Sequence, residues 1–384
     1  MTEGPRHLVM VSDAPATCGV EAFSRLTAER LGRRSATYVL GLDRTGLKRA
    51  LREADSLVLN FPIVAWKKKL LEPVVAALTA RMMGKAVVVV LHEWTDLDWK
   101  RRLALSPVCL LATAILFSAP EVAAQFAASP MAPAATRGRG VIPIPPNVIP
   151  AARAARSTTA EALRAQRRMG RLILGQFGSI YPKKHSARVL DVAVRLIEAG
   201  RDVAVVFVGS FIKGQDTIEA DLHRRAEELG LRDRVMVTGY IDDTETLSGI
   251  FAEIDAFAYA FPDGLTERRA SVLTAALSGK PVIVNAPRSR EGLDRHPLFA
   301  ALIADRLIRL APTDADPVAL AHLVLDSLAV RRRPRLQPEA AIADLWGSIV
   351  SVIDAAVADG RTAQRSSVIL PDVVLERRQG ADTD

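Results

Sequence analysis

Four segments combine residue types that can bind a phosphate or a sugar. In the first, 17–21, Gly19 opens a helical pattern soon after an apolar run. Glycine lets the backbone approach an anion, and the free N–H groups of a helix N-terminus attract it. In the second, 91–94, His92 follows another apolar run, where its imidazole can hydrogen-bond a hydroxyl group or stabilise developing charge. A plain turn and a strand-capping histidine explain these two segments about equally well.

The third segment, 175–184, holds a glycine pair and two lysines after an apolar run. The glycines bring the backbone close to a ligand. Lys184 lies six residues after Gly178 and can reach back to a diphosphate. Because a lysine on a loop is more often a solvated charge, this segment predicts a phosphate site only in combination with the others.

The fourth segment, 261–283, carries the most weight. It runs from an apolar strand end through a glycine-containing loop into a helix that glycine and proline terminate. The first turn of this helix offers unpaired N–H groups around Ala270 and Ser271 to a diphosphate. The side chains of Glu267 and Thr274 are expected to project toward hydroxyl groups of a bound sugar nucleotide.

The elements that must position these residues are short β-branched runs separated by helical patterns. Runs such as 86–91 and 203–208 are apolar on both faces, so they need cover on both sides, as in a parallel sheet between helix layers. The sequence therefore predicts two consecutive doubly wound α/β domains, with the candidate residues at the carboxyl edges of the sheets. The expected strands are 7–13, 37–42, 56–61, 86–93, 114–119, 141–145, 171–178, 203–210, 235–240, 256–261, 281–286 and 306–311.

The expected domains are an N-terminal Rossmann-like domain at 1–160 and a C-terminal Rossmann-like domain at 168–335. Several prolines between 143 and 150 remove backbone donors for a strand ladder, and a polar stretch rich in arginine and alanine follows. Residues 336–384 are expected to form one amphipathic helix, at 339–359, and a polar tail.

The amino-acid composition excludes several classes of protein. The chain has 384 residues, of which 49% are hydrophobic and 5% aromatic, which suits two α/β domains. Two distant cysteines, Cys18 and Cys109, exclude a disulfide scaffold and a cysteine-ligated zinc site, and they favour a reducing cytoplasm. No apolar run approaches 18 residues, so no membrane span is expected. The net charge of +8 favours polyanions, anionic lipids or phosphorylated substrates as partners.

Segment 274–283 resembles the Glu-Ala-Met-Ala-x-Gly-x-Pro-Val-Ile segment of retaining glycosyltransferases of the GT-B fold, the "group 1" family. Four further segments match the same family in the same order: 19–21, 92–94, 141–147 and 178–184. The resemblance implies two Rossmann-like domains that face each other across a cleft. It also implies transfer of a sugar from a nucleotide-diphosphate sugar, with retention at the anomeric carbon and without a metal or other cofactor.

The resemblance also implies roles for the candidate residues. The catalytic candidates are His92, near the reacting carbon, and Glu267, which recognises the sugar. Lys184 would pair with the donor phosphates, and Tyr240 lies where the family packs the nucleobase. The candidates for donor binding are Gly19, Gly178, Ser179, Lys184, Tyr240, Arg268, Ala270, Ser271 and Thr274.

Several positions depart from the family pattern. The two family glutamates fall at Thr266 and Thr274, so a carboxylate for the ribose is missing and Glu267 needs a one-residue shift. A family arginine in the phosphate loop is Ser179, which removes one positive charge. The adjacent pair Arg268 and Arg269 is a candidate replacement.

By the same resemblance the N-terminal domain holds a glycan or lipid-linked acceptor, as in surface polysaccharide or glycolipid synthesis, and the last helix returns to that domain. Basic segments with tryptophan, from Trp66 to Leu71 and from Trp99 to Leu103, suit the interface of an anionic membrane. They predict a cytoplasmic protein that is peripheral at the inner membrane face. A solvated helix face is the alternative, and the arginine run 331–333 is interpreted as a solvated linker.

Three other functions stay open. Thr266 and Thr274 favour a catalytically silent GT-B protein that serves as a binding or scaffold subunit. A sugar-nucleotide epimerase of similar fold would need acid and base residues that the sequence does not indicate. A basic nucleic-acid-binding protein would show binding that falls steeply with salt, and no nucleic acid is expected as a partner.

Overall fold

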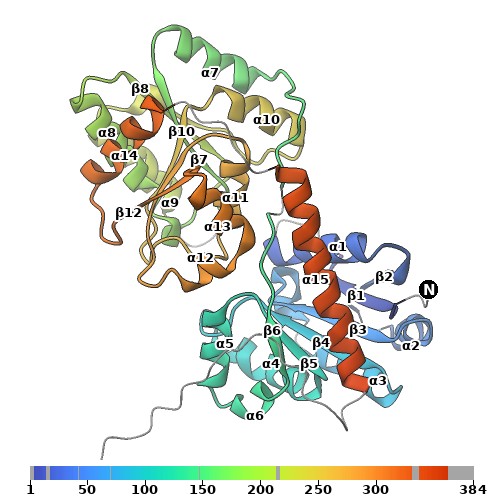
Figure 1. The fold of residues 1–384 in the computed structure, drawn as a ribbon. Helices are drawn as coiled ribbons and strands as arrows, with labels where there is room; N and C mark the ends of the chain where they lie inside the picture. The colour runs from blue at the N-terminus through green and yellow to red at the C-terminus, as the bar shows by residue number, and fades with distance from the viewer. Residues whose placement is uncertain are drawn as a thin grey trace, which may run out of the picture. The chain divides into compact units, whose positions relative to one another are not determined.

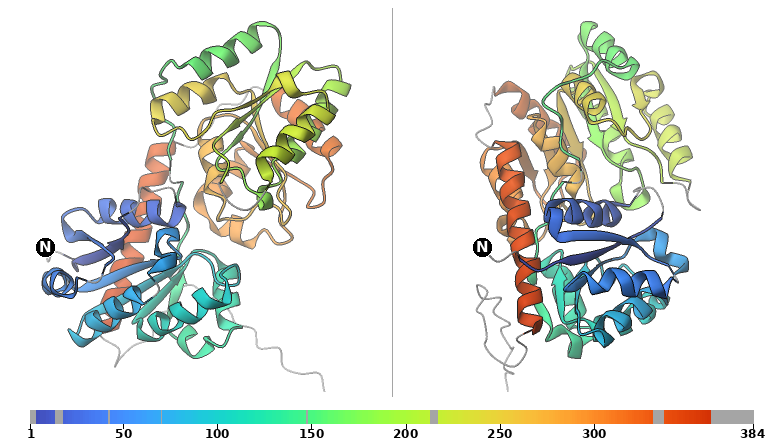
Figure 2. Two further views of the ribbon diagram at one scale, coloured as in Figure 1. Left: turned by 180° about the vertical axis from the view of Figure 1, so that it is seen from behind. Right: turned by 90° about the vertical axis from the view of Figure 1, so that its right-hand side faces the viewer.

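The computed structural model describes residues 4–13, 18–41, 43–69, 71–146, 148–212, 217–330 and 337–361. The chain divides into unit 1, which takes residues up to Ile142 and from Val350 on, and unit 2, from Pro143 to Ile349. In each unit, helices cover both faces of a six-stranded sheet (Figure 1 and Figure 2). Thr17, Asn147, the arginine run 331–333 and the expected polar tail beyond 361 lie outside the described residues.

Unit 1 contains a parallel sheet in the order β2-β1-β3-β4-β5-β6. Its strands are β1 His7–Val11, β2 Ser35–Val39, β3 Ser56–Phe61, β4 Ala86–Leu91, β5 Ala114–Phe117 and β6 Gly138–Val141. Its helices are α1 Gly19–Leu31, α2 Arg44–Arg52, α3 Glu72–Met82, α4 Trp99–Leu111, α5 Pro120–Ala127 and α6 Ala132–Ala135, with 3-10 turns at Gly32–Arg34 and Val64–Lys68. The direction of winding reverses between β1 and β3.

Unit 2 contains a parallel sheet in the order β12-β11-β10-β7-β8-β9. Its strands are β7 Leu172–Phe177, β8 Val203–Val208, β9 Val235–Val237, β10 Ala256–Tyr259, β11 Val282–Asn285 and β12 Ile308–Ala311. Its helices are α7 Thr158–Arg168, α8 Ala187–Glu198, α9 Ile218–Glu228, α10 Thr244–Glu253, α11 Ala270–Leu277, α12 Glu291–Arg295, α13 Pro297–Ala304 and α14 Pro317–Ala329, with 3-10 turns at Pro182–Lys184 and Arg232–Arg234. Winding reverses between β7 and β10.

The apolar runs become the cores of the two units. Every residue of β4 and of β8 is buried, as expected for strands that helices cover on both faces. Burying one such valine or leucine side chain stabilises the fold by about 1.5–3 kcal/mol. The prediction of two doubly wound parallel-sheet domains is therefore confirmed.

The junction between the units differs from the expectation. The strand expected at 141–145 is β6, which ends at Val141, because Pro143 and Pro145 have no N–H to donate to a neighbouring strand. Unit 1 ends at Ile142, before the expected boundary at 160. The polar stretch that follows contains α7, which begins at Thr158, where Ser157 caps it by accepting from Ala160 N.

The segment that begins at Trp66 also differs from the expectation. Trp66 lies within the 3-10 turn Val64–Lys68. Trp66 is 4% exposed and meets Phe61 edge to face, at 5.5 Å between ring centroids. Trp66 is therefore a core residue of unit 1 and not a residue that a membrane can contact.

The last described helix, α15 Pro338–Arg361, begins in unit 2 and ends in unit 1. Its stretch Pro338–Ala358 is long and apolar enough to cross a membrane by length and composition alone. However, Ile342, Ile349 and Ile353 are at most 1% exposed and recur at helical spacing, which indicates a helix with one face packed on protein. Asp354 joins this helix to unit 1 through His7 Nε2 at 2.8 Å and Arg34 Nη1 at 2.9 Å.

Candidate nucleotide site in unit 2

A doubly wound fold is expected to have a crevice where its winding reverses, and in unit 2 this place, the unit 2 crevice, is the carboxyl edge between β7 and β10. In doubly wound folds, the loops that follow the two strands at such a point leave in opposite directions, and ligands bind between them. Here these loops are the Gly178 loop after β7 and the 260–269 loop after β10. Two of the four segments that the sequence singled out therefore meet at one place.

Gly178 brings the two loops into contact. Its φ is +97°, a conformation that other residues rarely adopt. A Cβ on this residue would lie 2.9 Å from Ser271 Cβ and 3.1 Å from Lys184 Nζ. The position therefore requires glycine both for its backbone conformation and for space, and it juxtaposes Lys184 with the start of α11.

Lys184 is enclosed at this point, with only 2% of the residue exposed. Its Nζ donates to the Phe177 carbonyl at 2.6 Å and lies 5.7 Å from the ring centroid of Tyr259. Burial, and next the positive charge of Arg269, lower the pKa of Lys184 to about 7. The ammonium is thus held in a region that disfavours its own charge.

Arg269 supplies a second cation. Its guanidinium stacks on Phe261, at 4.5 Å from the ring centroid, and donates to the hydroxyl of Tyr181. Among the residues that the structure describes, neither Arg269 nor Lys184 forms an ion pair with a carboxylate. Two uncompensated cations in a partly desolvated crevice are electrostatically unfavourable unless an anion joins them.

Tyr259 connects these groups and was not among the residues that the sequence indicated. Its hydroxyl accepts from Phe177 N at 3.1 Å and lies 3.4 Å from Ser271 O, and its ring stacks on Phe261 at 5.5 Å. Burial raises the pKa of the Tyr259 phenol, so the hydroxyl stays neutral. Because Tyr259 is an ordinary strand residue by sequence, only the folded structure shows that it supports the cations.

The N-terminus of α11 completes the crevice. The helix begins at Ala270, and no side chain caps it. The Ala270 N–H donates to the Arg268 carbonyl at 3.1 Å. The positive end of the helix dipole lies beside Gly178, because Ser271 is the residue that a Gly178 side chain would meet. Of the predicted donor-binding residues, the structure therefore brings together Gly178, Lys184, Ala270 and Ser271.

Gly209 is a further residue that the sequence analysis did not single out. Its φ is +154°, and a Cβ there would lie 2.5 Å from the Gly178 carbonyl oxygen. Its N–H donates to Thr238 Oγ1 at 3.2 Å. The sequence feature that could have indicated Gly209 is its position directly after the apolar run 203–208.

Thr274 does not have the environment expected of a donor-binding residue. It is 1% exposed, and its hydroxyl donates to the Val148 carbonyl at 2.7 Å. Thr274 is the fifth residue of α11, and this hydrogen bond joins the helix to the segment that leads into unit 2. The structure gives the Thr274 hydroxyl a backbone partner within unit 2, and its contact with a sugar nucleotide stays a prediction.

The remaining unit 2 candidates lie around the crevice rather than in the cluster. The carboxylate of Glu267 lies against Gly292, so a side chain at position 292 would require Glu267 to move. Tyr240 follows β9 and is 67% exposed, with its hydroxyl 3.4 Å from Asp242 Oδ1. Ser179 and Arg268 are each partly buried. Their roles toward a donor stay predictions.

Unit 1 holds the other two candidates at the carboxyl edge of its own sheet. His92 follows β4 and is 7% exposed, with Nε2 3.4 Å from Asn60 Oδ1 and its ring 5.0 Å from that of Phe23. Gly19 opens α1. In the first turn of α1, the Glu21 carboxylate accepts from Ser12 N at 3.1 Å and pairs with Arg25 at 2.8 Å. The sugar-contacting role of His92 and the phosphate role of Gly19 stay predictions.

Metal ligands do not gather within the described part of the chain, where no group of three or more His, Cys, Asp or Glu side chains is placed to hold an ion. The chemistry of the unit 2 crevice is that of an anion site instead. It offers an ammonium, a guanidinium and backbone N–H groups at a glycine-lined turn, which are the groups that grip phosphate oxygens.

The chain is similar to known proteins in part of its sequence and in its fold. Residues 171–324 match the family model described as glycosyl transferases group 1. No curated protein sequence matches significantly. In fold, the chain is similar to Anabaena Alr3699/HepE, solved with UDP and glucose, at 16% identity and a TM-score of 0.57 over 94% of this chain and all of that one.

Two further solved structures are similar over nearly the whole chain. A glycosyltransferase from Rickettsia africae is 12% identical, with a TM-score of 0.53 over 93% of this chain and 94% of that one. The lipopolysaccharide outer core galactosyltransferase WaaB is 12% identical, with a TM-score of 0.52 over 94% of this chain and all of that one. At these identities the likeness establishes the two-domain fold that these proteins share.

Proposed function

We propose that this chain, which has the GT-B fold and whose residues 171–324 match the group 1 glycosyl transferase model, transfers a sugar from a nucleotide-diphosphate sugar to a glycan or lipid-linked acceptor. The transfer proceeds with retention at the anomeric carbon and without a metal, in surface polysaccharide or glycolipid synthesis. The donor binds at the unit 2 crevice. UDP is the first nucleotide to test, because HepE was solved with UDP and with UDP-glucose.

One observation carries the proposal: Lys184 and Arg269 converge at a glycine turn and a helix start without an acidic partner among the described residues. A diphosphate supplies the missing negative charge, and its oxygens accept from both cations and from the α11 backbone. During transfer the charge on the departing nucleoside diphosphate grows, so the same groups stabilise the transition state more than the ground state. The acceptor hydroxyl attacks the same face of the sugar, and the leaving phosphate takes its proton.

The test is a panel of UDP, GDP, ADP and their sugars. We expect one nucleotide to raise the melting temperature of the full chain, and its sugar to be hydrolysed slowly in the absence of acceptor. Stabilisation should disappear in Lys184→Ala. No stabilisation by any of these nucleotides would contradict the assignment of the crevice.

A catalytically silent binding protein is the second candidate function. Its support is that Thr266 and Thr274 replace the two family glutamates, and that Thr274 is buried and bonded to backbone. The same panel separates the two candidates. Stabilisation by a nucleotide sugar without any hydrolysis or transfer, over a range of acceptors, would favour the silent protein.

We also place the acceptor in unit 1 and the protein at the cytoplasmic face of an anionic membrane. Trp99 and Leu103 on α4 are 65% and 67% exposed, and Lys100 lies between them. Apolar side chains beside cations suit the interfacial region of such a membrane. We expect Trp99→Ala combined with Leu103→Ala to reduce pelleting with anionic vesicles, and Met169→Ser, an exposed apolar residue of unit 2, to leave it unchanged. Absence of pelleting at low salt would contradict this placement.

A further inference from the structure

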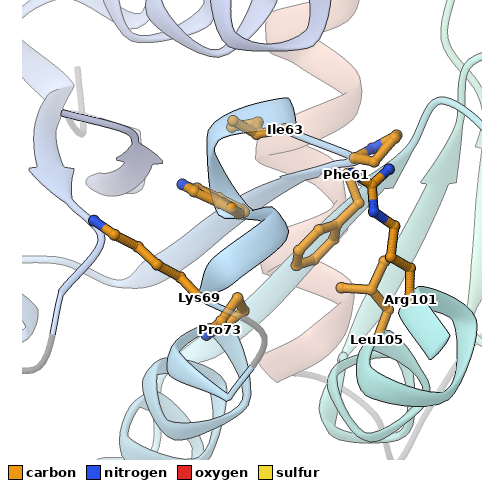
Figure 3. A pocket seen from close by; sticks show the side chains of 8 residues that line it. Phe61, Ile63, Lys69, Pro73, Arg101 and Leu105 are labelled. Atoms are coloured by element: carbon orange, nitrogen blue, oxygen red, sulfur yellow. The ribbon is translucent and has the colours of Figure 1, made fainter. Parts of the chain in front are cut away.

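Asn60 is a fully buried polar residue near the carboxyl end of β3, in the sheet of unit 1. Successive residues of a strand point to opposite faces of the sheet. Phe61, the next residue, points to the face that α3 and α4 cover, where it lines a small pocket together with Leu105 (Figure 3). Asn60 therefore points to the other face, where its side chain meets His92.

The side-chain amide of Asn60 is satisfied at only one of its two ends. Its Oδ1 lies 3.4 Å from His92 Nε2, whereas its Nδ2 finds no acceptor among the residues that the structure describes. Buried N–H groups without an acceptor are rare in native proteins, because leaving them unpaired costs stability. A leucine at position 60 would avoid that cost. The stability of unit 1 therefore does not explain an asparagine here.

Other contacts of His92 fix its backbone and the plane of its ring. Its N–H donates to the Phe61 carbonyl at 2.8 Å, and its carbonyl accepts from Ser118 Oγ at 3.1 Å. Its ring meets that of Phe23 edge to face, at 5.0 Å between centroids. Of these contacts and the one with Asn60, only the latter distinguishes the two ring nitrogens. Because an amide oxygen accepts from a nitrogen that carries a proton, this contact places the imidazole proton on Nε2 and the lone pair on Nδ1.

We propose that Asn60 is a positioning residue, which fixes the tautomer and the ring orientation of His92. With its proton held on Nε2, the imidazole meets a hydroxyl group of the sugar as a hydrogen-bond acceptor, through Nδ1. The unpaired Nδ2 of Asn60 is then stability that unit 1 gives up for a preorganised histidine. The part that His92 plays in transfer rests on the proposed function, whereas its tautomer can be measured without any substrate.

The ring nitrogens of His92 provide a direct readout of the tautomer. The chain has six histidines, so ¹⁵N-histidine labelling gives few ring signals, and His92→Gln identifies those of His92. In the full chain, at a pH where the ring is neutral, we expect a proton on Nε2 and none on Nδ1. A neutral His92 that carries its proton on Nδ1 would overturn the proposal, because the Asn60 amide would then be a donor to the ring.

Two substitutions at position 60 test whether Asn60 sets this tautomer. Asn60→Leu removes the acceptor, so the ring signals of His92 should shift toward each other as both tautomers become populated. Asn60→Asp keeps an acceptor oxygen at the same place, so the neutral ring should retain its proton on Nε2. Melting curves show that each variant is folded. Unaltered ring signals of His92 in a folded Asn60→Leu would overturn the proposal.

A matched variant of β3 separates positioning from a general effect on folding. Ser56 lies on the same strand and the same face, is fully buried, and also contacts a histidine, with its Oγ 2.8 Å from His7 Nδ1. Ser56→Ala should lower the melting temperature and leave kcat unaltered. Asn60→Leu should lower the melting temperature less, because it also removes the unpaired Nδ2.

The kinetic effect of Asn60→Leu should be confined to the transfer step. We expect kcat to fall about tenfold or more, because a misplaced group near the reacting atoms slows the reaction steeply, and the KM for the nucleotide sugar to stay within about twofold. Unaltered kcat in a folded Asn60→Leu, or an equal loss in Ser56→Ala, would overturn this inference and leave the proposed function in place. Absence of transfer in the unaltered chain would contradict the proposed function, and the tautomer of His92 would then decide the inference by itself.

Discussion

The two units share one architecture but distribute charge differently at the carboxyl edges of their sheets. In unit 1, the charges near the edge are compensated within the unit: Lys69 pairs with Asp13 at 3.3 Å, and Glu21 pairs with Arg25 at 2.8 Å. In unit 2, Lys184 and Arg269 contact a carbonyl, a hydroxyl and aromatic rings, and no carboxylate among the described residues. Unit 2 therefore carries positive charge that its own side chains leave uncompensated.

This difference indicates which unit is prepared for a polyanion. Enclosing an ammonium without a counter-charge costs stability, and a fold keeps such a group when a ligand completes it. A unit whose charges are already paired gains little from a diphosphate, although it can still hold neutral or singly charged groups. This difference supports the proposal that the donor phosphates bind in unit 2.

The largest expected effect comes from removing the enclosed ammonium. Lys184→Ala should lower kcat/KM for the nucleotide sugar by about 100-fold or more, because it deletes a charge aimed at the leaving diphosphate. Lys280→Ala is the matched control: Lys280 also donates to a backbone carbonyl, that of Ala252 at 2.9 Å, and burial also lowers its pKa. Steady-state kinetics should show loss in the first variant only. Equal loss in both would point to a general effect on folding.

The next effect tests the close approach of the two loops. Gly178→Ala and Gly200→Ala both force a side chain into a positive φ, of +97° and +81°, which costs each about 1–2 kcal/mol of stability, and Gly178→Ala costs more because its Cβ also collides with Ser271. Nothing lies within 4 Å of a Cβ at Gly200, whereas one at Gly178 meets Ser271 and Lys184. Titration calorimetry should therefore show nucleotide affinity reduced about tenfold in Gly178→Ala alone. Similar affinity in both variants would contradict a crevice at Gly178.

A third prediction tests the compensated unit. Asp354→Ala removes the acceptor for His7 Nε2 and for Arg34 Nη1, so the free energy of unfolding should fall by about 1–3 kcal/mol. Asp344→Ala, an exposed aspartate of the same helix, should change it by less than about 0.5 kcal/mol. Urea unfolding measures both values. Nucleotide affinity should be unaltered in both variants. A loss of affinity in Asp354→Ala would contradict the proposal that nucleotide binding depends on unit 2 alone.

The sequence predicts those features of the fold and of the candidate site that depend on residues close together in the chain, and it misses those that depend on contacts between distant residues. Strands such as 86–91, and the glycine and lysine of the third segment, follow from local patterns. The sequence analysis did not predict the burial of Trp66. The lysines that follow Trp66 suggested an exposed segment, whereas its indole packs on Phe61 in the core of unit 1. The contact between Thr274 and Val148 was missed as well, because it joins residues 126 positions apart.

The pKa of Lys184 gives a prediction with opposite signs for folding and binding. Burial lowers this pKa to about 7, below the ordinary 10.5, so the unfolded chain binds more protons between these values and the free energy of unfolding rises with pH across that window. A bound diphosphate favours the charged ammonium, so the complex takes up a proton above pH 7. Affinity should then fall as pH rises, by up to about tenfold per unit.

Calorimetry of nucleotide binding at pH 8.5, in buffers that differ in ionisation enthalpy, measures this proton uptake. Lys184→Met should abolish both the uptake and the pH dependence that belongs to this group. Affinity that is independent of pH between 7 and 9 in the unaltered chain would show that the ammonium and the diphosphate do not interact.

The smallest expected effect concerns the threonine that replaces a family glutamate. Thr274→Val keeps the side-chain shape and removes the hydroxyl that donates to the Val148 carbonyl, so the free energy of unfolding should fall by about 1 kcal/mol. The KM for the nucleotide sugar should stay the same, because the hydroxyl faces the backbone of unit 2. If the KM instead rises while stability is unchanged, the threonine contacts the donor, and the crevice extends further along α11 than its uncompensated charges indicate.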